Sequence, residues 1–486
     1  MINSQLNIVT YFNTNTDENR IIFYIIGTAG IILTLILSYY AIIPIFLLFI
    51  YSISTENKKN FLLWLVVVTL LTLVGELNAS MRLIIQITDV MILLYLFFFR
   101  FGLNISIYPK IPSAMLPFLL LYYFALIIST LMSNYPLAGM MMIIRQTVFF
   151  IIVYLLFAMI EDEKDIKIFF SALLFSAFVM ASSTIYSFIL YSGSFFDLSS
   201  GSRGRIAGFI TNPNNISNYY LISFPLLIVS ILKSKIFISP KLAWVLITYF
   251  SFALIITLSR SALLGILVSS IIVLFVLKRK YFYYITSISV FAILVIVFND
   301  SIQNFIVFLF RIERGVTGRD YLWDLSINII RDNPILGLGP GAYKYEVFNY
   351  FPIMLNSWTG EMLIKTFIEA NGANLSHNYF LFLFSELGVL GLVVSIYLVI
   401  IFLSFWRVLK FFKDKTTNSY YLVVALLAIG ISEFVRALFE SIGILFFGVI
   451  SADLPFWLVF ISLSFFAKKY KIHSKAIQIS SKQNVQ

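Results

Sequence analysis

Residues 378–405, NYFLFLFSELGVLGLVVSIYLVIIFLSF, decide the fold class of this chain because they form one long apolar run. Glu386 is the only charged residue within it. An apolar run of about 20 residues is long enough to cross a bilayer as a helix, whereas runs of about 10–14 residues are typical of buried helices in soluble proteins. The sequence therefore predicts a transmembrane helix here.

The composition extends this prediction to the whole chain. Of 486 residues, 60% are hydrophobic and 12% are charged, and none is cysteine. The mean hydropathy is +0.95. Soluble domains contain about 25% charged residues, so this chain has too few polar side chains to cover a globule in water. A soluble enzyme, a disulfide scaffold and a disordered chain are thereby excluded.

The apolar runs predict an all-α polytopic membrane protein with about 12–14 transmembrane helices and one large outer loop domain. Residues 21–54 form either one long tilted helix or a hairpin broken near Pro44. Residues 1–19 do not resemble a signal peptide. The candidate spans are residues 21–38, 41–54, 61–77, 83–101, 115–132, 138–160, 168–193, 216–233, 242–259, 261–277, 281–299, 378–405, 420–441 and 444–467.

Lysine and arginine are distributed unevenly between the segments that connect the spans. Twenty-one of them lie in segments that alternate onto one side, and four lie in the short segments on the other side. Because basic residues accumulate in cytoplasmic segments, the first set is predicted to be cytoplasmic, including the tail after Ala467. The net charge of +11 thus records topology rather than binding to nucleic acid. The long segment 300–377 is outer, and we expect the chemistry there.

Four unusual polar motifs fall on this outer face. Thr317 and Asp320 have the spacing of a capping box, which predicts an amphipathic helix of about fourteen residues that Pro334 terminates. Since the short outer segments hold so few cations, the coincidence of three arginine motifs and a histidine is difficult to ascribe to chance. The motifs comprise the loop residues Arg203, Arg205, Asn212 and Asn214, the break at Ser259 and Arg260, the helix start at Arg319 with Tyr321 and Trp323, and the re-entry point Ser376-His377-Asn378.

These residue types suit one kind of chemistry. Arginine side chains can clamp a diphosphate and stabilise charge on a leaving phosphate, and a neutral histidine can take a proton from a sugar hydroxyl. The simpler alternatives are arginines that reach lipid phosphates, a histidine that caps a helix, and a plain turn at residues 337–341. The outer face has no Asp-x-Asp, histidine pair or thiol, so no metal site is predicted. Asp320 and Asp324 are expected to pair with Arg319 or to face water.

Several charges lie within the predicted spans. Glu433, Arg436 and Glu440 have the spacing of one helix face in the span 420–441, where they are either functional or a self-neutralising contact between helices. None is predicted to be catalytic. Three further charges are isolated in the sequence and are expected to find partners across the bundle: Asp89, Arg145 and Glu386.

The motifs in residues 200–405 resemble the shared domain of bacterial O-antigen polymerases and O-antigen ligases. That family's pattern is Arg-x-x-x-Trp, then Pro-(Ile/Leu)-(Leu/Phe)-Gly-x-Gly, then His-Asn, then Glu-x-Gly-x-x-Gly. This chain has all four in the same order, at 319–323, 334–339, 377–378 and 386–391. Residues 257–260, and Gly208 with residues 212–214, are also similar to the family.

The resemblance implies a glycosyltransferase of the GT-C type that takes glycan from undecaprenyl diphosphate on the outer side of the bacterial cytoplasmic membrane. It implies no cofactor, no metal and no nucleotide sugar, and a chain-length regulator protein would be a partner. His377 would activate the acceptor hydroxyl, and Arg260 and Arg319 would bind the diphosphate. Further substrate-binding residues would be Arg203, Arg205, Asn212, Asn214, Asn378, Trp323 and Tyr321.

The expected organisation has three parts. Residues 1–199 form N-terminal transmembrane helices, residues 200–405 form the catalytic region with the outer loop 300–377, and residues 406–486 form C-terminal transmembrane helices and a basic cytoplasmic tail.

The acceptor distinguishes the two activities that this family shares. A growing undecaprenyl-linked chain makes the protein a polymerase of O-antigen or capsular polysaccharide, whereas a lipid A core sugar makes it a ligase. We favour a polymerase because about fourteen spans exceed the usual number in ligases. Relatives that glycosylate proteins or build teichuronic or capsular polymers are further alternatives. From other classes, a flippase or transporter would have paired broken helices in two halves, and a structural scaffold would need no long outer segment.

Overall fold

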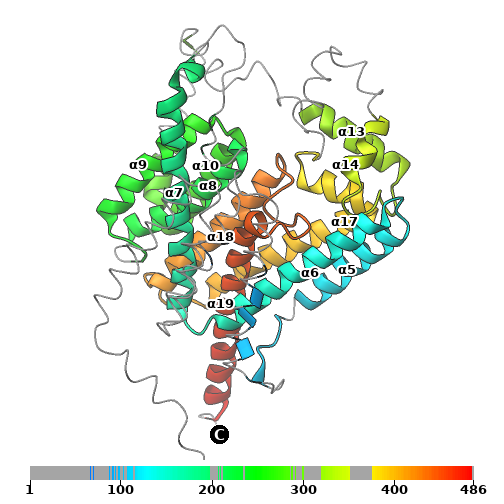
Figure 1. The fold of residues 1–486 in the computed structure, drawn as a ribbon. Helices are drawn as coiled ribbons and strands as arrows, with labels where there is room; N and C mark the ends of the chain where they lie inside the picture. Colours follow the sequence, from blue (N-terminus) through cyan, green and yellow to red (C-terminus); the bar gives the residue numbers. More distant parts are fainter. Residues whose placement is uncertain are drawn as a thin grey trace, which may run out of the picture.

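The structure is a computed structural model. It describes residues 115–196, 212–233, 236–284, 319–350 and 375–483, except for some side chains within these ranges. It also describes scattered residues between these ranges and from 66 to 112. The described residues form helices and no β-strand (Figure 1). Eight of these helices are long and apolar enough to cross a membrane, and a ninth is apolar but shorter. The chain is therefore an all-α, multi-pass membrane protein, as predicted.

Most described spans lie within a few residues of the predicted ones. The remaining candidate spans, at 21–38, 41–54, 61–77, 83–101 and 281–299, lie wholly or largely outside the described residues, so the total of 12–14 stays a prediction. The helices are α5 (Met115–Leu131), α6 (Pro136–Met159), α7 (Glu163–Phe196), α8 (Pro213–Leu232), α9 (Pro240–Thr257), α10 (Arg260–Leu277), α13 (Arg319–Asp332), α14 (Tyr343–Glu346), α17 (Tyr379–Ser404), α18 (Asn418–Ala437) and α19 (Ile450–Gln483), with 3₁₀ helices at Val347–Tyr350 and Phe405–Phe411.

Helix α18 lies at the centre of the bundle. It packs against α8, α10 and α19, while α17 packs against α5 and carries α13. Figure 1 shows α7 to α10 on one side of α18 and α5, α6 and α17 on the other. The apolar stretches of α18 and α19 are almost wholly buried, whereas fewer than half of the residues in those of α9 and α10 are buried. The protein core therefore lies along α18 and α19.

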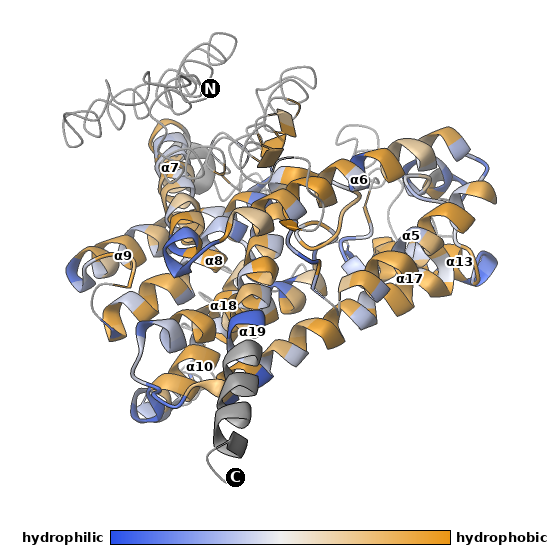
Figure 2. Cartoon of the chain, turned by 90° about the horizontal axis from the view of Figure 1, so that it is seen from below, coloured by the Kyte–Doolittle hydropathy of each residue, from blue (hydrophilic) through white to orange (hydrophobic). Residues whose placement is uncertain are grey.

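The outer helices present apolar faces that suit lipid. On α5, Leu116, Leu120, Phe124, Ile127 and Leu131 are all exposed and recur every three or four residues, so they form one stripe along the helix. Such a stripe is unfavourable in water and favourable against acyl chains. Figure 2 shows the same pattern across the bundle, with hydrophobic helices and hydrophilic ends and connections.

The segments predicted to be cytoplasmic meet at one end of the bundle. The Lys469 ammonium group lies 2.9 Å from a carboxylate oxygen of Glu163, and the Ser419 hydroxyl donates a hydrogen bond to the same carboxylate group. Glu163 begins α7, Ser419 lies in the first turn of α18, and Lys469 belongs to α19. The structure therefore groups the connections as the charge distribution predicted. The assignment of this end to the cytoplasm stays a prediction.

Helix α17 is broken at Gly388, which has φ +63° and ψ −155°, although the sequence predicted one continuous span. The loop that follows α13 fills the break. Its three backbone hydrogen bonds run from Leu338 N to Ser385 O (2.9 Å), from Gly339 N to Glu386 O (2.8 Å) and from Val389 N to Pro334 O (2.9 Å). Irregular backbone at membrane depth is tolerated only where the protein satisfies its polar groups. The motifs 334–339 and 386–391 are thus one structural unit.

The buried Glu386 side chain fastens this unit. Its carboxylate accepts hydrogen bonds from the backbone N–H groups of Gly341 and Tyr343 (3.0 Å for Tyr343). The Ser129 hydroxyl of α5 lies within hydrogen-bond distance of the carbonyl oxygens of Leu336 (2.6 Å) and Glu386 (2.8 Å). Glu386 therefore has backbone amides as partners, and its contacts hold the α13–α14 connection against α17. This connection in turn positions α13, which begins at Arg319.

Candidate active site

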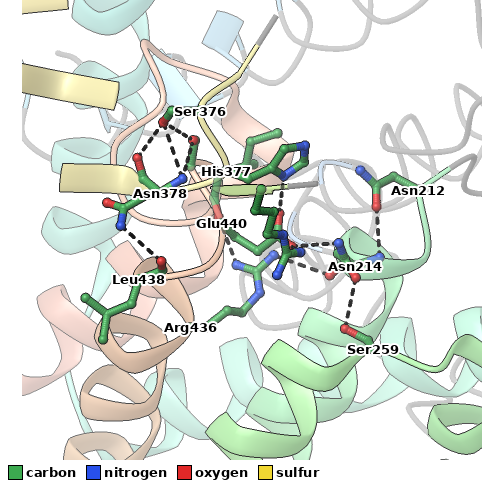
Figure 3. A network of polar contacts seen from close by, with 12 residues as sticks. Asn212, Asn214, Ser259, Ser376, His377, Asn378, Arg436, Leu438 and Glu440 are labelled. Carbon is green, nitrogen blue, oxygen red and sulfur yellow. Dashed lines mark hydrogen bonds and ion pairs between the residues drawn. The ribbon is translucent and has the colours of Figure 1, made fainter. Parts of the chain in front are cut away.

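Five segments that are far apart in the sequence converge at the end of the bundle opposite Glu163. They are the first turn of α8, the start of α10, the start of α13, the turn before α17 and the segment after α18. Their side chains include Asn214, Arg260, Arg319, His377 and Glu440, and Figure 3 shows how several of them point toward Glu440. Residues from all four predicted polar motifs therefore meet at one site.

Glu440 is the centre of this cluster. One carboxylate oxygen accepts hydrogen bonds from the Arg319 guanidinium and from the side-chain amide of Asn214 (2.6 Å). The other carboxylate oxygen lies 3.1 Å from Nδ1 of His377. Only 3% of the Glu440 side chain is exposed, compared with 23% for His377. Glu440 is thus out of reach of a substrate, whereas His377 is accessible.

The contact with Glu440 fixes the roles of the two ring nitrogens of His377. Burial favours a raised pKa for Glu440, but the hydrogen bond with His377 and the nearby histidine and arginine charges outweigh burial and hold the pKa below its ordinary value. Glu440 is therefore ionised near neutral pH and can only accept hydrogen bonds. In the neutral His377 ring, Nδ1 consequently carries the hydrogen and Nε2 carries the lone pair.

The backbone around His377 is held in an uncommon conformation. His377 has φ +50°, in the left-handed region that non-glycine residues seldom adopt. The Ser441 hydroxyl accepts a hydrogen bond from the Asn378 N–H (3.1 Å), and the Asn378 side chain caps α17 by accepting from Leu381 N (3.0 Å). The turn is therefore fixed on both sides, so that the ring of His377 points toward Glu440.

Arg260 and Arg319 give the site its positive charge. Their guanidinium groups are close enough to repel each other. The N-termini of α8, α10, α13 and α17 also lie at this end, and each carries a partial positive charge. At α10, the Ser259 hydroxyl donates to Asn214 Oδ1 (3.1 Å) and does not cap the helix. Together these features make the site suitable for an anion.

The three predicted asparagines have structural contacts. Asn212 caps α8, because its side-chain oxygen accepts from Asn214 N (2.9 Å). Asn214 bridges Ser259 and Glu440 with the two ends of its amide group. Asn378 caps α17 and donates to the Leu438 carbonyl (3.0 Å). These contacts position the neighbours of His377, and binding of substrate by the same side chains stays a prediction.

Trp323 is the predicted aromatic residue whose surroundings are described. Its ring lies 6.3 Å from that of Phe439, the neighbour of Glu440 in the sequence. The indole N–H is buried and has no hydrogen-bond partner in the described part of the chain. Asp324 is exposed, as expected. Arg203, Arg205 and Thr317 lie outside the described residues, as do the side chains of Asp320 and Tyr321.

The predicted helix face with Glu433, Arg436 and Glu440 is wrong, because α18 ends at Ala437 and Glu440 lies beyond it. Arg436 remains 3.5 Å from Glu433, and it donates to the Ile442 carbonyl (2.8 Å). Sequence reasoning therefore missed Glu440 as a residue of the site. A signal was present, since Glu440 is an acidic residue at the end of a span that is predicted to face outward, on the same side as the arginine motifs.

Replacing Glu440 by alanine should strongly destabilise the protein. Arg319 would lose a buried carboxylate partner, which typically lowers the free energy of unfolding by about 3–5 kcal/mol. Melting of the purified protein in detergent measures the effect. Glu163→Ala is the matched control, because its partner Lys469 is largely exposed and such pairs contribute about 1 kcal/mol or less. Equal losses for both variants would contradict the central role of Glu440.

The stabilisation by Glu440 should depend on pH. Because the pKa of Glu440 is lowered in the folded protein, its contribution is fully present above the ordinary value of about 4.5 and is lost as the pH falls through the folded value. The difference in melting temperature between wild type and Glu440→Ala should therefore shrink as the pH falls from 6 toward 3. A difference that stays constant over this range would show that the carboxylate charge is not responsible.

The described residues contain no group of three or more His, Asp or Glu side chains that could hold a metal ion. The prediction that the site works without a metal is not tested by this observation and stays a prediction.

Comparison with known proteins gives one match. The family model described as O-antigen ligase matches residues 244–396, which include Arg260, Arg319 and His377. No curated protein matches the chain. The matched segment contains the four family motifs, and the structure brings the Arg260, Arg319 and His377 motifs together at one site. Residues 244–396 are therefore similar to the O-antigen ligase family, in agreement with the resemblance of the motifs to O-antigen ligases and polymerases.

Proposed function

We propose that this protein is a glycosyltransferase that joins undecaprenyl-diphosphate-linked oligosaccharide units into a surface polysaccharide on the outer side of the bacterial cytoplasmic membrane. The observation that carries the proposal is the contact of His377 with Glu440, beside Arg260 and Arg319. This arrangement supplies a general base and an anion-binding group at one end of a membrane bundle.

His377 acts as the base in the proposed reaction. Nε2 of the neutral ring takes the proton of an acceptor sugar hydroxyl, and that oxygen attacks the anomeric carbon of the donor. The bond between this carbon and the diphosphate oxygen breaks, and the diphosphate leaves with the electron pair. Glu440 stabilises the imidazolium that forms, because its carboxylate accepts from Nδ1–H. A positioned base of this kind contributes about 10²–10⁴-fold to the rate.

Arg260 and Arg319 bind the diphosphate of the donor and stabilise the charge that develops when it leaves. The salt bridge with Glu440 holds the Arg319 side chain in place. The helix N-termini at the same end add backbone N–H groups, which favour phosphate. Trp323 is suited to contact a sugar because its side chain is only partly buried.

A ligase is the second candidate, and the description of the matching family as O-antigen ligase favours it. The two activities differ in the acceptor. A polymerase needs only lipid-linked oligosaccharide, which serves as both donor and acceptor, whereas a ligase needs lipid A core as well.

Reconstitution of the purified protein in liposomes tests the proposal. With lipid-linked repeat units from the source bacterium as the sole substrate, wild type should produce a ladder of polymer lengths. Arg319→Gln should reduce the yield by at least about tenfold, because a charge-assisted contact to phosphate contributes more than about 1.4 kcal/mol. Arg331→Gln is the matched control, since Arg331 is exposed at the other end of α13. Product that forms only when lipid A core is added would identify a ligase instead.

A further inference from the structure

A cavity lies beside the turn that carries His377. Its volume is about 290 Å³, and Leu375, two residues before His377, lines it. Two cationic side chains, Arg145 and Lys344, line it together with the carboxylate of Glu386 and the rings of Phe382, Phe446 and Phe447. None of these residues takes part in the cluster around Glu440, so the cavity is a separate feature.

Arg145 is an unusual residue for its place in the fold. It is nine residues beyond Pro136 in the apolar helix α6, which places it about 14 Å along the helix from its start. Charged side chains at such a depth are rare because they are costly to bury in a membrane, and they commonly mark functional sites. The Arg145 side chain is exposed, and its guanidinium lies 3.8 Å from the sulfur of Met142.

Two buried carboxylates lie at or near the cavity, and both accept hydrogen bonds from backbone N–H groups. Glu386 accepts from the N–H groups of Gly341 and Tyr343, as described above. Asp453 accepts from the N–H groups of Gly443 (3.2 Å) and Phe446. Glu386 thus holds the loop with Gly341, and Asp453 holds the loop with Phe446. Both loops line the cavity.

The lining of the cavity thus carries two cations and one carboxylate, so it is positively charged overall. Among the described residues, no salt bridge joins Arg145 or Lys344 to a carboxylate. Lys344 lies over the ring of Tyr345, 4.7 Å from its centre, at the outer end of the bundle. Arginine and lysine side chains bind phosphate groups. A cavity that two of them line together with aromatic rings therefore suits a phosphate-bearing lipid headgroup.

We propose that this cavity binds the diphosphate of the second lipid-linked substrate, the acceptor, while Arg260 and Arg319 bind that of the donor. This assignment rests on the proposed function, in which two lipid diphosphates must occupy the protein at once. The position of the cavity supports it, because Leu375 connects the cavity directly to the turn of His377. An acceptor held there can extend its sugars toward Nε2 of His377.

Counting bound diphosphate tests the proposal without any activity assay. The protein is placed in phosphatidylcholine nanodiscs and dialysed against radiolabelled farnesyl diphosphate. Wild type should bind two equivalents, Arg145→Gln/Lys344→Gln should bind one, and Arg260→Gln/Arg319→Gln should bind one. Arg331→Gln/Lys413→Gln, which removes two exposed cations elsewhere, should bind two. Lys344→Gln alone changes only an exposed side chain and should weaken the second equivalent by about tenfold.

The outcomes separate the two hypotheses. If Arg145→Gln/Lys344→Gln bound two equivalents of farnesyl diphosphate, the proposal of a binding site in the cavity would be wrong, and the proposed function would be unaffected. If Arg260→Gln/Arg319→Gln bound two equivalents of farnesyl diphosphate, the proposed binding of the donor diphosphate by these arginines would be wrong, and the proposed site in the cavity would be unaffected. Added phosphatidylglycerol distinguishes the source of the phosphate and should not displace the probe at equal concentration. Displacement from the second site would overturn the assignment to a substrate, because an ordinary anionic lipid would then occupy the cavity.

Discussion

Replacing His377 by asparagine is expected to lower the rate of glycan transfer by about 10²–10⁴-fold, the contribution of a positioned general base. Asparagine accepts positive φ more readily than most residues, so the turn at φ +50° should be retained. The lone pair of Nε2 is lost, and an amide cannot take its place as a base. Single-turnover transfer in the reconstituted system measures the effect on the chemical step.

The control for this variant is His473→Asn in the C-terminal part of α19, which should leave the rate within about twofold of wild type. Binding of farnesyl diphosphate should also be unchanged in His377→Asn, because His377 acts on the acceptor hydroxyl and the arginines bind phosphate. Transfer at the wild-type rate would show that another group removes the proton. Loss of both transfer and binding would show that His377 supports the site rather than the chemistry.

Replacing Gly388 by valine is expected to prevent the protein from folding. A β-branched residue at φ +63° is strained, and a Cβ atom at this position would overlap the backbone of Ile335. Backbone strain and overlap of this kind cost at least about 3 kcal/mol together. The fraction of protein that remains monodisperse after extraction into detergent should therefore fall to a small part of the wild-type value.

Val389→Ala is the control for this variant. Val389 is next in the sequence and its side chain is exposed, so its truncation should change the melting temperature by only a few degrees. If Gly388→Val melted like wild type, the break in α17 would not be required by the fold.

Much of the fold could be predicted because a membrane turns an apolar run into a helix. The predicted span 261–277 differs by one residue from α10, and the capping box with Pro334 gave the length of α13. The break in α17 could not be predicted in this way. Residues 386–391 lie within an apolar run that contains no proline, and the break is stable only because the distant segment 334–341 supplies its hydrogen bonds.

The site was predicted in part for a similar reason. Sorting the charges by side brought Arg260, Arg319 and His377 together, because topology alone places them at one end. Glu440 was missed because the helical spacing of Glu433 and Arg436 was extended beyond the end of α18. The path of the chain after Ala437 depends on tertiary contacts, such as the hydrogen bond from Asn378 to the Leu438 carbonyl, and no local pattern encodes them.

The central place of Glu440 has a consequence for biosynthesis. Chains enter the membrane from the N-terminus during translation, so Asn214, Arg260, Arg319 and His377 are made before Glu440, the last of the five in the sequence. Until Glu440 has been made, Arg319 and His377 lack the carboxylate that both of them contact in the structure. The cluster is thus completed only after α18, the penultimate described span, because Glu440 follows that helix in the sequence.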